Sequence, residues 1–329
     1  MRAIHVDHVG GPERLVLQEV AQPQLTSAPD REGDGEVVVG VHLAGVNYID
    51  VYHRTGRYPL PTPFTPGVEG VGVIRACSPT AGERGLAVGQ RVGWVMTPGS
   101  YAEAALVPAS KVIPLPDDID DEAAVALLVQ GLTAHYLAVD TYRLAPGEIA
   151  VVHAGAGGVG WLLIQLATAL GAVVIATAST PEKCRLCRAA GAQVAVGYDD
   201  VGGAVDEVTD GVGAHVVYDG VGAATFPESL RLLRRRGTLV VYGAASGPVP
   251  PFDLGALMPG SPYLTRPSLA DYIVADDLQQ RARAVFTAYR ARQLRPQAPT
   301  RYPLADAARA HRDLESRATS GKLVLTVTA

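Results

Sequence analysis

Three glycines spaced as G-x-G-x-x-G are the residues of this chain best suited to bind a dinucleotide. Gly155, Gly157 and Gly160 follow the apolar run 149–154 and precede an apolar pattern with helical spacing. Glycines at this spacing let the backbone approach a pyrophosphate, and the helix N-terminus offers amides and positive dipole to it. The order predicts a strand, a phosphate loop and a helix. The alternative is an ordinary turn in a chain with 36 glycines.

The residues that follow the next apolar run indicate which dinucleotide is bound. NAD-specific sites place a carboxylate about 20 residues after the glycines, where it accepts hydrogen bonds from the ribose hydroxyls. Here the run 173–180 ends in Ser179 and Thr180, and Lys183 follows. A cation and hydroxyls suit a 2′-phosphate, so NADPH is predicted in preference to NADH. The alternative for Lys183 is a solvated helix face, and the neighbouring Glu182 opposes phosphate binding mildly.

Composition and charge indicate a globular enzyme-sized protein. The chain has 329 residues, 48% of them hydrophobic and 19% charged, with a net charge of −5. That length accommodates about two domains with cores of their own. A slightly acidic chain gives no electrostatic reason to expect nucleic acid or an anionic membrane as the main partner.

Three cysteines do not make a disulfide framework, so a reducing, cytoplasmic location is expected. Cys184 and Cys187 form a C-x-x-C, but no second pair completes a zinc set, and ordinary half-buried helix positions are expected for them. The start of the chain lacks the apolar core of a signal peptide. The apolar stretch 159–177 is interrupted by Gln165 and Gly171, so we predict no transmembrane segment.

Alternating patterns after residue 149 predict a parallel sheet wound by helices on both faces. Residues 1–124 instead show short strand-like runs broken by Gly and Pro, as in an antiparallel or barrel-like domain, with a polar loop at 26–35. The part after residue 269 has two helical patterns and a last strand at 322–327, expected to pack on the first domain. The strands predicted are 37–43, 71–76, 89–94, 149–154, 173–179, 193–198, 215–219 and 237–242.

Several separate motifs, in order along the chain, carry a resemblance to a known family. The chain is similar to the NADPH-dependent quinone oxidoreductases, the zeta-crystallin-like branch of the medium-chain dehydrogenase/reductase superfamily, over essentially its whole length. The matching segments are AGVNYIDVYHRTGRYP (44–59), QGLTAHYL (130–137), HAGAGGVG (153–160), VYDGVG (217–222), YLTRPSL (263–269) and YPLADAARAHRDLESRATSGK (302–322).

This resemblance implies an α/β fold of two domains. A GroES-like, β-rich catalytic domain would comprise residues 1–124 and 269–329, and a Rossmann domain would be inserted as residues 125–268. It also implies a cleft between the domains and a homodimer joined through Rossmann sheet edges.

The same resemblance bears on zinc. Zinc-dependent members of the superfamily carry a cysteine near the position of Asn47 and a Gly-His-Glu where this chain has Gly67, Val68 and Glu69. Neither an asparagine nor a valine replaces a thiolate or an imidazole as a zinc ligand. The enzyme implied by the resemblance is therefore predicted to work without metal.

Without a Lewis acid, the charge that a hydride places on a quinone oxygen must be stabilised by hydrogen-bond donors. The segment 44–59 resembles the family's active-site wall. It implies Asn47 as a positioning donor to cofactor ribose or substrate, Tyr52 as the polar contact to quinone or nicotinamide, and Tyr58 as a stacking ring. The alternatives are a helix-capping asparagine and tyrosines packed at a domain edge. Asp50 is assigned no role.

Further cofactor contacts follow from the resemblance, position by position. Gln130 stands where relatives often carry lysine, so a donor is kept while a charge is lost. Each of the other positions could instead be a turn or surface residue. The implied contacts besides Asn47, Gln130, Gly155 and Gly160 are Thr133 near the nicotinamide, Gly157, Gly158 and Val159 at the pyrophosphate, Ser179, Lys183 and Tyr198 at the adenosine phosphate, Tyr242, Gly243 and Ser246 after the fifth strand, Leu264, Thr265 and Arg266 in a carboxamide loop, and Arg317 near the phosphate.

Two other functions stay open beside quinone reduction. Reduction of an α,β-unsaturated ketone or aldehyde places charge on a conjugated oxygen in the same way, so the same donors would serve. The non-enzymatic alternative is an NADPH-binding protein that also binds RNA through Arg231 and the run 234–236. Against it, cations in the last turn of a helix ending at Gly237 would complement the helix dipole, and no aromatic residues interleave with them.

Overall fold

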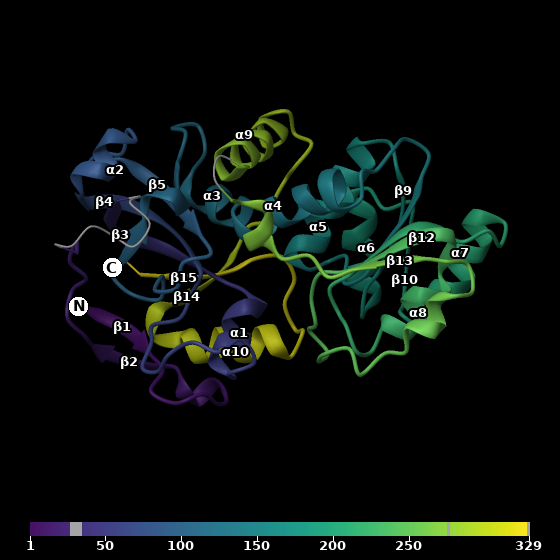
Figure 1. Cartoon of the computed structure of the whole chain (residues 1–329), viewed down its shortest axis with the longest axis horizontal. Helices are drawn as coiled ribbons and strands as arrows, with labels where there is room; N and C mark the ends of the chain where they lie inside the picture. Colours follow the sequence, from purple (N-terminus) through teal and green to yellow (C-terminus); the bar gives the residue numbers. More distant parts are fainter. Residues whose placement is uncertain (27–34, 275–276, 328–329) are drawn as a thin grey trace. The chain divides into compact units, whose positions relative to one another are not determined.

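The computed structural model describes residues 1–26, 35–274 and 277–327, so most of the polar loop predicted at 26–35 lies outside the described residues. The chain divides into two compact units, coloured by sequence in Figure 1. The first unit comprises Met1–Val129 and Gln297–Ala329, and the second unit comprises Gln130–Pro296.

The first unit is built on a mostly antiparallel sheet of seven strands in the order β14-β15-β3-β4-β5-β7, with β6 paired to β3. Its buried core includes Trp94, Tyr101 and Leu325. This sheet confirms the β-rich domain and the strands predicted at 37–43, 71–76 and 89–94. The elements are β1 Arg2–His5, β2 Val16–Glu19, β3 Glu36–Val46, β4 Glu69–Cys77, β5 Arg91–Val95, β6 Ala104–Pro108, β7 Val112–Pro114, β14 Thr300–Pro303, β15 Leu323–Thr326, α1 Tyr48–Arg54, α2 Pro79–Glu83, α3 Asp121–Leu127 and α10 Ala307–Glu315.

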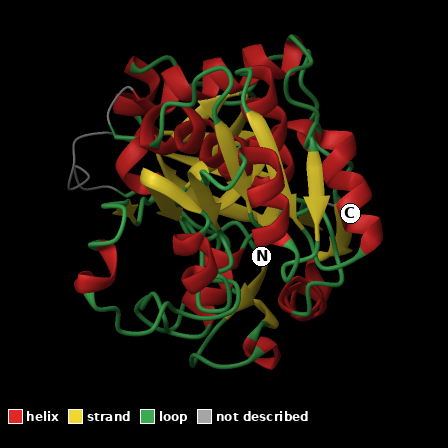
Figure 2. Ribbon diagram, turned by 90° about the vertical axis from the view of Figure 1, so that its right-hand side faces the viewer, coloured by secondary structure: helices red, strands yellow, loops and turns green. Residues whose placement is uncertain are grey.

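The second unit is a parallel sheet of six strands in the order β10-β9-β8-β11-β12-β13, with α5 to α8 packed on its strands. Figure 2 is viewed from the side on which these elements are labelled in Figure 1, with strands in yellow and helices in red. The order reverses between β8 and β11, and open sheets bind ligands at the carboxyl ends of strands at such a point. The elements are α4 Val129–Tyr136, a π-helical turn Leu137–Thr141, β8 Ile149–Val152, α5 Gly158–Ala169, β9 Val173–Thr177, α6 Pro181–Ala190, β10 Val194–Val196, α7 Val201–Thr209, β11 Ala214–Asp219, α8 Phe226–Arg231, β12 Leu233–Val241, β13 Tyr263–Thr265 and α9 Asp277–Arg290.

Local chemistry explains why the predicted helix at 181–190 forms where it does. The Thr180 side chain accepts a hydrogen bond from Lys183 N, and Pro181 stands at the first helical position. Gly191 ends the helix with a φ of 118°, in the left-handed region that glycine adopts without strain. The five parallel strands predicted after residue 149 are all present, and the structure adds a sixth, β13, that was not predicted as a strand.

The arginine run differs from its prediction. Helix α8 ends at Arg231, and residues 234–236 lie in β12, not in the last turn of a helix. In the ladder with β11, Leu233 pairs with Ala214 and Thr238 pairs with Val216, so residues 234–237 bulge out of register. The prediction was wrong because a run of cations is compatible both with the last turn of a helix and with an irregular, out-of-register stretch of a strand.

The division into units differs from the predicted domain boundaries at residues 269–296. The sequence put this segment with the first domain, whereas it is part of the second unit. Arg281 on α9 donates to Asp140 Oδ2 at 2.6 Å and to His135 Nδ1 at 2.9 Å, and Tyr272 stacks on Tyr136 at 4.3 Å between ring centroids. These contacts hold α9 against α4 and the π-helical turn.

One helical stretch, Asp121–Thr141, is long and apolar enough to cross a membrane by length and composition alone. However, 78% of its most apolar window is buried within the protein. A core helix meets the same criteria, and this stretch has the burial of one.

Candidate functional site

The glycine loop of the second unit connects β8 to α5 with close backbone packing. A Cβ placed on Gly160 would lie 2.5 Å from the Ala154 carbonyl oxygen and 2.8 Å from Gly155 Cα. The Gly157 amide, predicted to face the pyrophosphate, instead donates to Ala154 O at 2.9 Å. The amides of Gly158, Val159 and Gly160 belong to the first helical turn, which has no intrahelical acceptors for them. These three are the donors available to an anion.

Gln130 lies beside this loop, as its assignment to the cofactor requires. A Cβ on Gly158 would overlap the Gln130 carboxamide, so the two residues are in direct contact. Gln130 and Thr133 are both on α4 and are 9% and 8% exposed. The side chain that replaces the family's lysine is therefore placed against the first residue of α5.

The carboxyl ends of β8, β9 and β10 bring together a second polar group. His153 Nδ1 bonds Thr177 Oγ1 at 2.9 Å, and the His153 ring stacks on Tyr198 at 6.0 Å between centroids. Burial lowers the pKa of His153, so its ring is neutral near pH 7. Ser179 is exposed and Lys183 is half-buried beyond the end of β9. The three residues assigned to the adenosine phosphate thus follow neighbouring strand ends.

Asp219, to which no role was assigned from the sequence, organises the ends of β11 and β12. Its carboxylate is fully buried and accepts from Val221 N, Gly222 N and the hydroxyl groups of Thr225 and Ser229, at 2.7–2.9 Å. Its carbonyl accepts from Tyr242 N and Gly243 N. The signal for it was an acidic residue at a strand end, followed by hydroxyl residues six and ten positions later.

Four other predicted cofactor residues are placed around the same sheet edge. The Ser246 hydroxyl donates to Val221 O and accepts from Ala224 N, which ties the two strand ends together. Leu264 and Thr265 do not form a loop but lie in β13, the edge strand paired with β12. Arg266 follows them and donates to Val241 O at 2.9 Å.

A buried cluster of Asn47, Glu69 and Lys322 lies in the first unit. Lys322 Nζ bonds Glu69 Oε1 and donates to Asn47 Oδ1 at 3.0 Å. Asn47 Nδ2 donates to Glu69 Oε1 at 2.6 Å. The register of β15 on β3 sets Leu323 opposite Val46, which brings residues 322 and 47 together. The Asn47 side chain is thus held by two charged groups, one of each sign.

A second set of buried groups, the donor chain Arg54–His311–Tyr101–Asp50, also ends beside Asn47. Arg54 pairs with Glu315 at 2.8 Å and donates to His311 Nδ1 at 3.4 Å. Because guanidinium only donates, neutral His311 carries its proton on Nε2 and donates to Tyr101 at 3.1 Å. Tyr101 then donates to Asp50 Oδ2, which also accepts from Asn47 N at 2.8 Å. Burial lowers the pKa of His311 to about 3, so its ring is neutral near pH 7 and the contact with Arg54 fixes this tautomer.

Asp50 should make stability depend on pH. Burial, reinforced by Glu69, raises its pKa to about 7, while hydrogen bonds from Asn47 and Tyr101 and the charge of Lys322 lower it. Its contribution to stability is therefore largest below the unfolded pKa near 4 and is lost as pH rises through 7. Relative to Asp50→Asn, the natural protein should lose on the order of 2 kcal/mol between pH 5 and 7. Urea denaturation at both pH values measures this, and a constant difference would contradict it.

The two tyrosines assigned to the aromatic wall lie next to each other in the first unit. Tyr52 is 8% exposed and Tyr58 is 38% exposed, and their rings meet edge to face at 5.1 Å. The Arg57 guanidinium lies 4.6 Å from the Tyr52 ring centroid. Arg317 is exposed after α10, with a φ of 58°. The two tyrosines are therefore neighbours in space, as their assignment requires.

The groups around Asn47 do not fit a zinc ion. Glu69 contacts both the Asn47 carboxamide and the Lys322 ammonium, and its charge is already paired with Lys322. Val68 presents an alkyl side chain, and a buried ammonium would repel a divalent cation. Among residues 1–26, 35–274 and 277–327, no cluster of three or more His, Cys, Asp or Glu could hold a metal.

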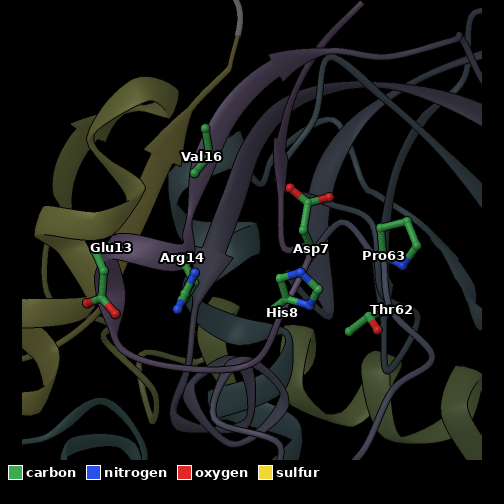
Figure 3. A pocket seen from close by; sticks show the side chains of 7 residues that line it. All are labelled: Asp7, His8, Glu13, Arg14, Val16, Thr62 and Pro63. Carbon is green, nitrogen blue, oxygen red and sulfur yellow. The ribbon is translucent and has the colours of Figure 1, made fainter.

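A surface hollow of about 510 Å³ lies elsewhere in the first unit (Figure 3). The β1–β2 connection, the start of β2 and the 62–63 loop supply its lining side chains, which carry charges of both signs. None of the predicted site residues is among them. Those lining residues are Asp7, His8, Glu13, Arg14, Val16, Thr62 and Pro63.

Comparison with known proteins shows which family the chain is similar to. Residues 33–117 match the alcohol dehydrogenase GroES-like domain, and residues 158–284 match the zinc-binding dehydrogenase domain. A quinone oxidoreductase of Pseudomonas aeruginosa is 41% identical over 322 residues, 96% of each chain. A 2-haloacrylate reductase of a Burkholderia species is 36% identical over 330 residues, again 96% of each.

A solved structure extends the same comparison to the fold. The quinone oxidoreductase of Escherichia coli complexed with NADPH superposes with a TM-score of 0.94 at 35% identity, covering 99% of this chain and 100% of that one. The agreement spans both units and the glycine loop. The chain therefore belongs to the quinone oxidoreductase family of the medium-chain dehydrogenases/reductases.

Proposed function

We propose that this protein is a zinc-independent NADPH:quinone oxidoreductase that passes reducing equivalents to small quinones. The observation that carries the proposal is identity of 41% to a named quinone oxidoreductase across 96% of both chains. NADPH supplies the hydride when it is bound. The protein's contribution is to hold the reactants and to offer hydrogen-bond donors to the oxygen on which charge develops.

One set of residues is proposed to bind the cofactor, and a second set is proposed to donate hydrogen bonds to the reactants. In the second unit, the amides of Gly158 to Gly160 would take the pyrophosphate, with Gln130 beside them, and Ser179, Lys183 and Tyr198 would take the adenosine phosphate. In the first unit, Asn47 and Tyr52 would donate to substrate or cofactor, with Tyr58 stacking. Contacts at Thr133, Tyr242, Gly243, Ser246, Leu264, Thr265, Arg266 and Arg317 remain part of the proposal.

Turnover with a panel of acceptors tests the function. NADPH oxidation would be followed with small quinones and with enones and haloacrylates, while electron spin resonance watches for semiquinone. We expect quinones to be preferred. The similarity to a 2-haloacrylate reductase favours double-bond reduction as the second candidate, and preference for enones or haloacrylates would establish it. NADPH binding without any turnover would instead favour the non-enzymatic alternative, and a gel shift lost on changing residues 234–236 would identify RNA as its partner.

Lys183→Ala should raise KM for NADPH at least about tenfold and leave KM for NADH nearly unchanged, because a charge-assisted bond to the 2′-phosphate contributes about 1.5–3 kcal/mol. The half-buried side chain stands beyond the end of β9, where an adenosine phosphate is expected. Steady-state kinetics with both cofactors measures the ratio. Equal effects on both would disprove the assigned phosphate pocket.

Exhaustive chelation should leave turnover unchanged, because the pair formed by Glu69 and Lys322 takes the place where ligands would be needed. The assay compares kcat before and after dialysis against a strong chelator. Inactivation that added zinc reverses would refute the metal-free assignment.

We also propose that the protein is a cytoplasmic homodimer joined through β13. This strand is the edge of the parallel sheet, and its Tyr263 and Leu264 are 57% and 37% exposed. Leu254 and Met258, which precede it, are 73% and 81% exposed. An unpaired edge with apolar side chains is a surface that another copy can cover. The three cysteines are free, as a reducing compartment requires.

A further inference from the structure

The orientation of the Asn47 side chain is fixed by the signs of the charges around it. A carboxamide can turn by 180° and exchange its oxygen and nitrogen with little change of shape. Lys322 has only donors and the Glu69 carboxylate has only acceptors. Asn47 Oδ1 must therefore face Lys322, and Nδ2 must face Glu69, as the hydrogen bonds of 3.0 and 2.6 Å show. The reversed orientation would set like groups against each other.

One hydrogen of the Asn47 carboxamide is left over in this arrangement. The Nδ2 group carries two hydrogens, and one is donated to Glu69 Oε1. Within the described parts of the chain, the second has no acceptor. The Asn47 backbone is also held, since its amide donates to Asp50 Oδ2 at 2.8 Å. A donor with a fixed backbone and a fixed rotamer is preorganised for a ligand oxygen.

Glu69 is itself immobilised from several sides. Its second oxygen, Oε2, accepts from Val129 N at 2.8 Å, at the break between α3 and α4. Gly45 on β3 faces it so closely that a Cβ there would overlap the carboxyl group. Glu69 is 0% exposed, and the Lys322 side chain is 1% exposed. The pair is thus a rigid support and not a surface ion pair.

Stability alone does not account for such a pair. Replacing a buried ion pair by well-packed apolar residues is often neutral or stabilising, because desolvation offsets the attraction between the charges. Removing one partner is what destabilises a protein. Glu69 and Lys322 both contact the Asn47 carboxamide, which is a proposed donor of the site. Their charges are therefore better explained by their effect on Asn47 than by a gain in stability.

We propose that Lys322 and Glu69 are positioning residues that lock the Asn47 carboxamide so that its second Nδ2 hydrogen is presented to the bound reactants. The inference rests on the proposed function, in which Asn47 donates to substrate or cofactor. It adds two residues to the reaction that do not touch the reactants themselves. They act by forbidding the reversed rotamer of Asn47.

A double-mutant cycle between Lys322 and Asn47 tests the inference. The variants are Lys322→Met, Asn47→Ala and the two combined, with Lys322→Arg as the conservative replacement and Lys111→Met as the matched control. We expect Lys322→Met to lower kcat with a quinone by about tenfold or more at nearly constant KM, since it removes an interaction used in the transition state. In the Asn47→Ala background the same change should have little further effect. Lys322→Arg should keep most of the natural kcat, because arginine also offers donors to Asn47 and Glu69.

Additive effects of Lys322→Met and Asn47→Ala would overturn the inference while leaving the proposed function intact. So would an Asn47→Ala variant with unchanged kcat and unchanged NADPH affinity. Failure of the natural protein to oxidise NADPH with any quinone would overturn the proposed function itself, so the two failures are distinguishable.

If Lys322→Met does not fold, a double variant that removes both charges tests the same inference. The variant Glu69→Leu with Lys322→Met leaves no unpaired buried charge and is expected to fold. Its kcat should be as low as that of Asn47→Ala. In a nitrogen-15 spectrum, the Asn47 side-chain amide should lose its protection from hydrogen exchange. If this folded variant has the kcat of the natural protein and the same protection of the Asn47 side-chain amide from hydrogen exchange, the positioning role is refuted.

Discussion

Replacing Asp219 by alanine should destabilise the second unit by about 3–5 kcal/mol, because four donors would lose a buried acceptor at once. The carboxylate collects two backbone amides and two hydroxyl groups at the end of β11. It also stands where the glycine loop 220–222 and the Tyr242 backbone meet. NADPH affinity should fall at least about tenfold, since loss of 1.4 kcal/mol at this edge suffices for that.

Asp206→Ala is the matched control, because Asp206 is exposed on α7 of the same unit. It should change stability by less than about 0.5 kcal/mol. Urea denaturation followed by circular dichroism gives the free energy of unfolding, and calorimetry gives the NADPH dissociation constant. An Asp219→Ala variant as stable as the control would show that the network is dispensable.

Gly160→Ala should weaken NADPH binding at least about tenfold and destabilise the protein by about 1–3 kcal/mol, as overpacking does. The added Cβ would stand 2.5 Å from the Ala154 carbonyl oxygen and 2.8 Å from Gly155 Cα, both of them backbone atoms. Neither can move like the end of a flexible side chain. The strand and helix would therefore separate, and the amides of the first helical turn would shift with them.

Gly203→Ala separates this effect from the general effect of alanine in a helix. Gly203 lies within α7, and a Cβ there would have no neighbouring atom within 4 Å. That variant should be more stable by about 0.5–1 kcal/mol, with natural NADPH affinity. If both alanine variants bind NADPH equally well, close packing of the phosphate loop is not what Gly160 provides.

Elements encoded by contiguous patterns could be predicted from the sequence. The apolar run at 149–154, the glycine motif and the helical spacing after it all lie within 25 residues, and the structure has β8 and α5 there. The cap of α6 by Thr180 and Gly191 is equally local. Short-range signals sufficed because the hydrogen bonds of α5 and α6 join residues close in the chain, and the strand β8 is itself a contiguous apolar run.

The contacts by which Lys322 and Glu69 hold the Asn47 side chain could not be predicted, because the three residues are far apart in the chain. Lys322 is 275 positions from Asn47 and 253 from Glu69. Only the register of β15 on β3 brings them together. The donor chain from Arg54 to Asp50 has the same character, since His311 reaches Tyr101 across 210 positions. No periodicity along the sequence specifies which strand will lie beside which.

The insertion of β15 between β3 and β14 affects the order in which the protein can be made. Residues 130–296 form a contiguous unit that can fold as soon as it leaves the ribosome, whereas the sheet of the other unit waits for residues 300–326. Until then residues 43–46 of β3 keep an unpaired edge, since β6 pairs only with residues 36–40, and Glu69 lacks its ammonium partner. Nascent chains in this interval are the species that a chaperone would recognise, and premature termination between residues 297 and 321 would leave a whole second unit beside an incomplete first unit.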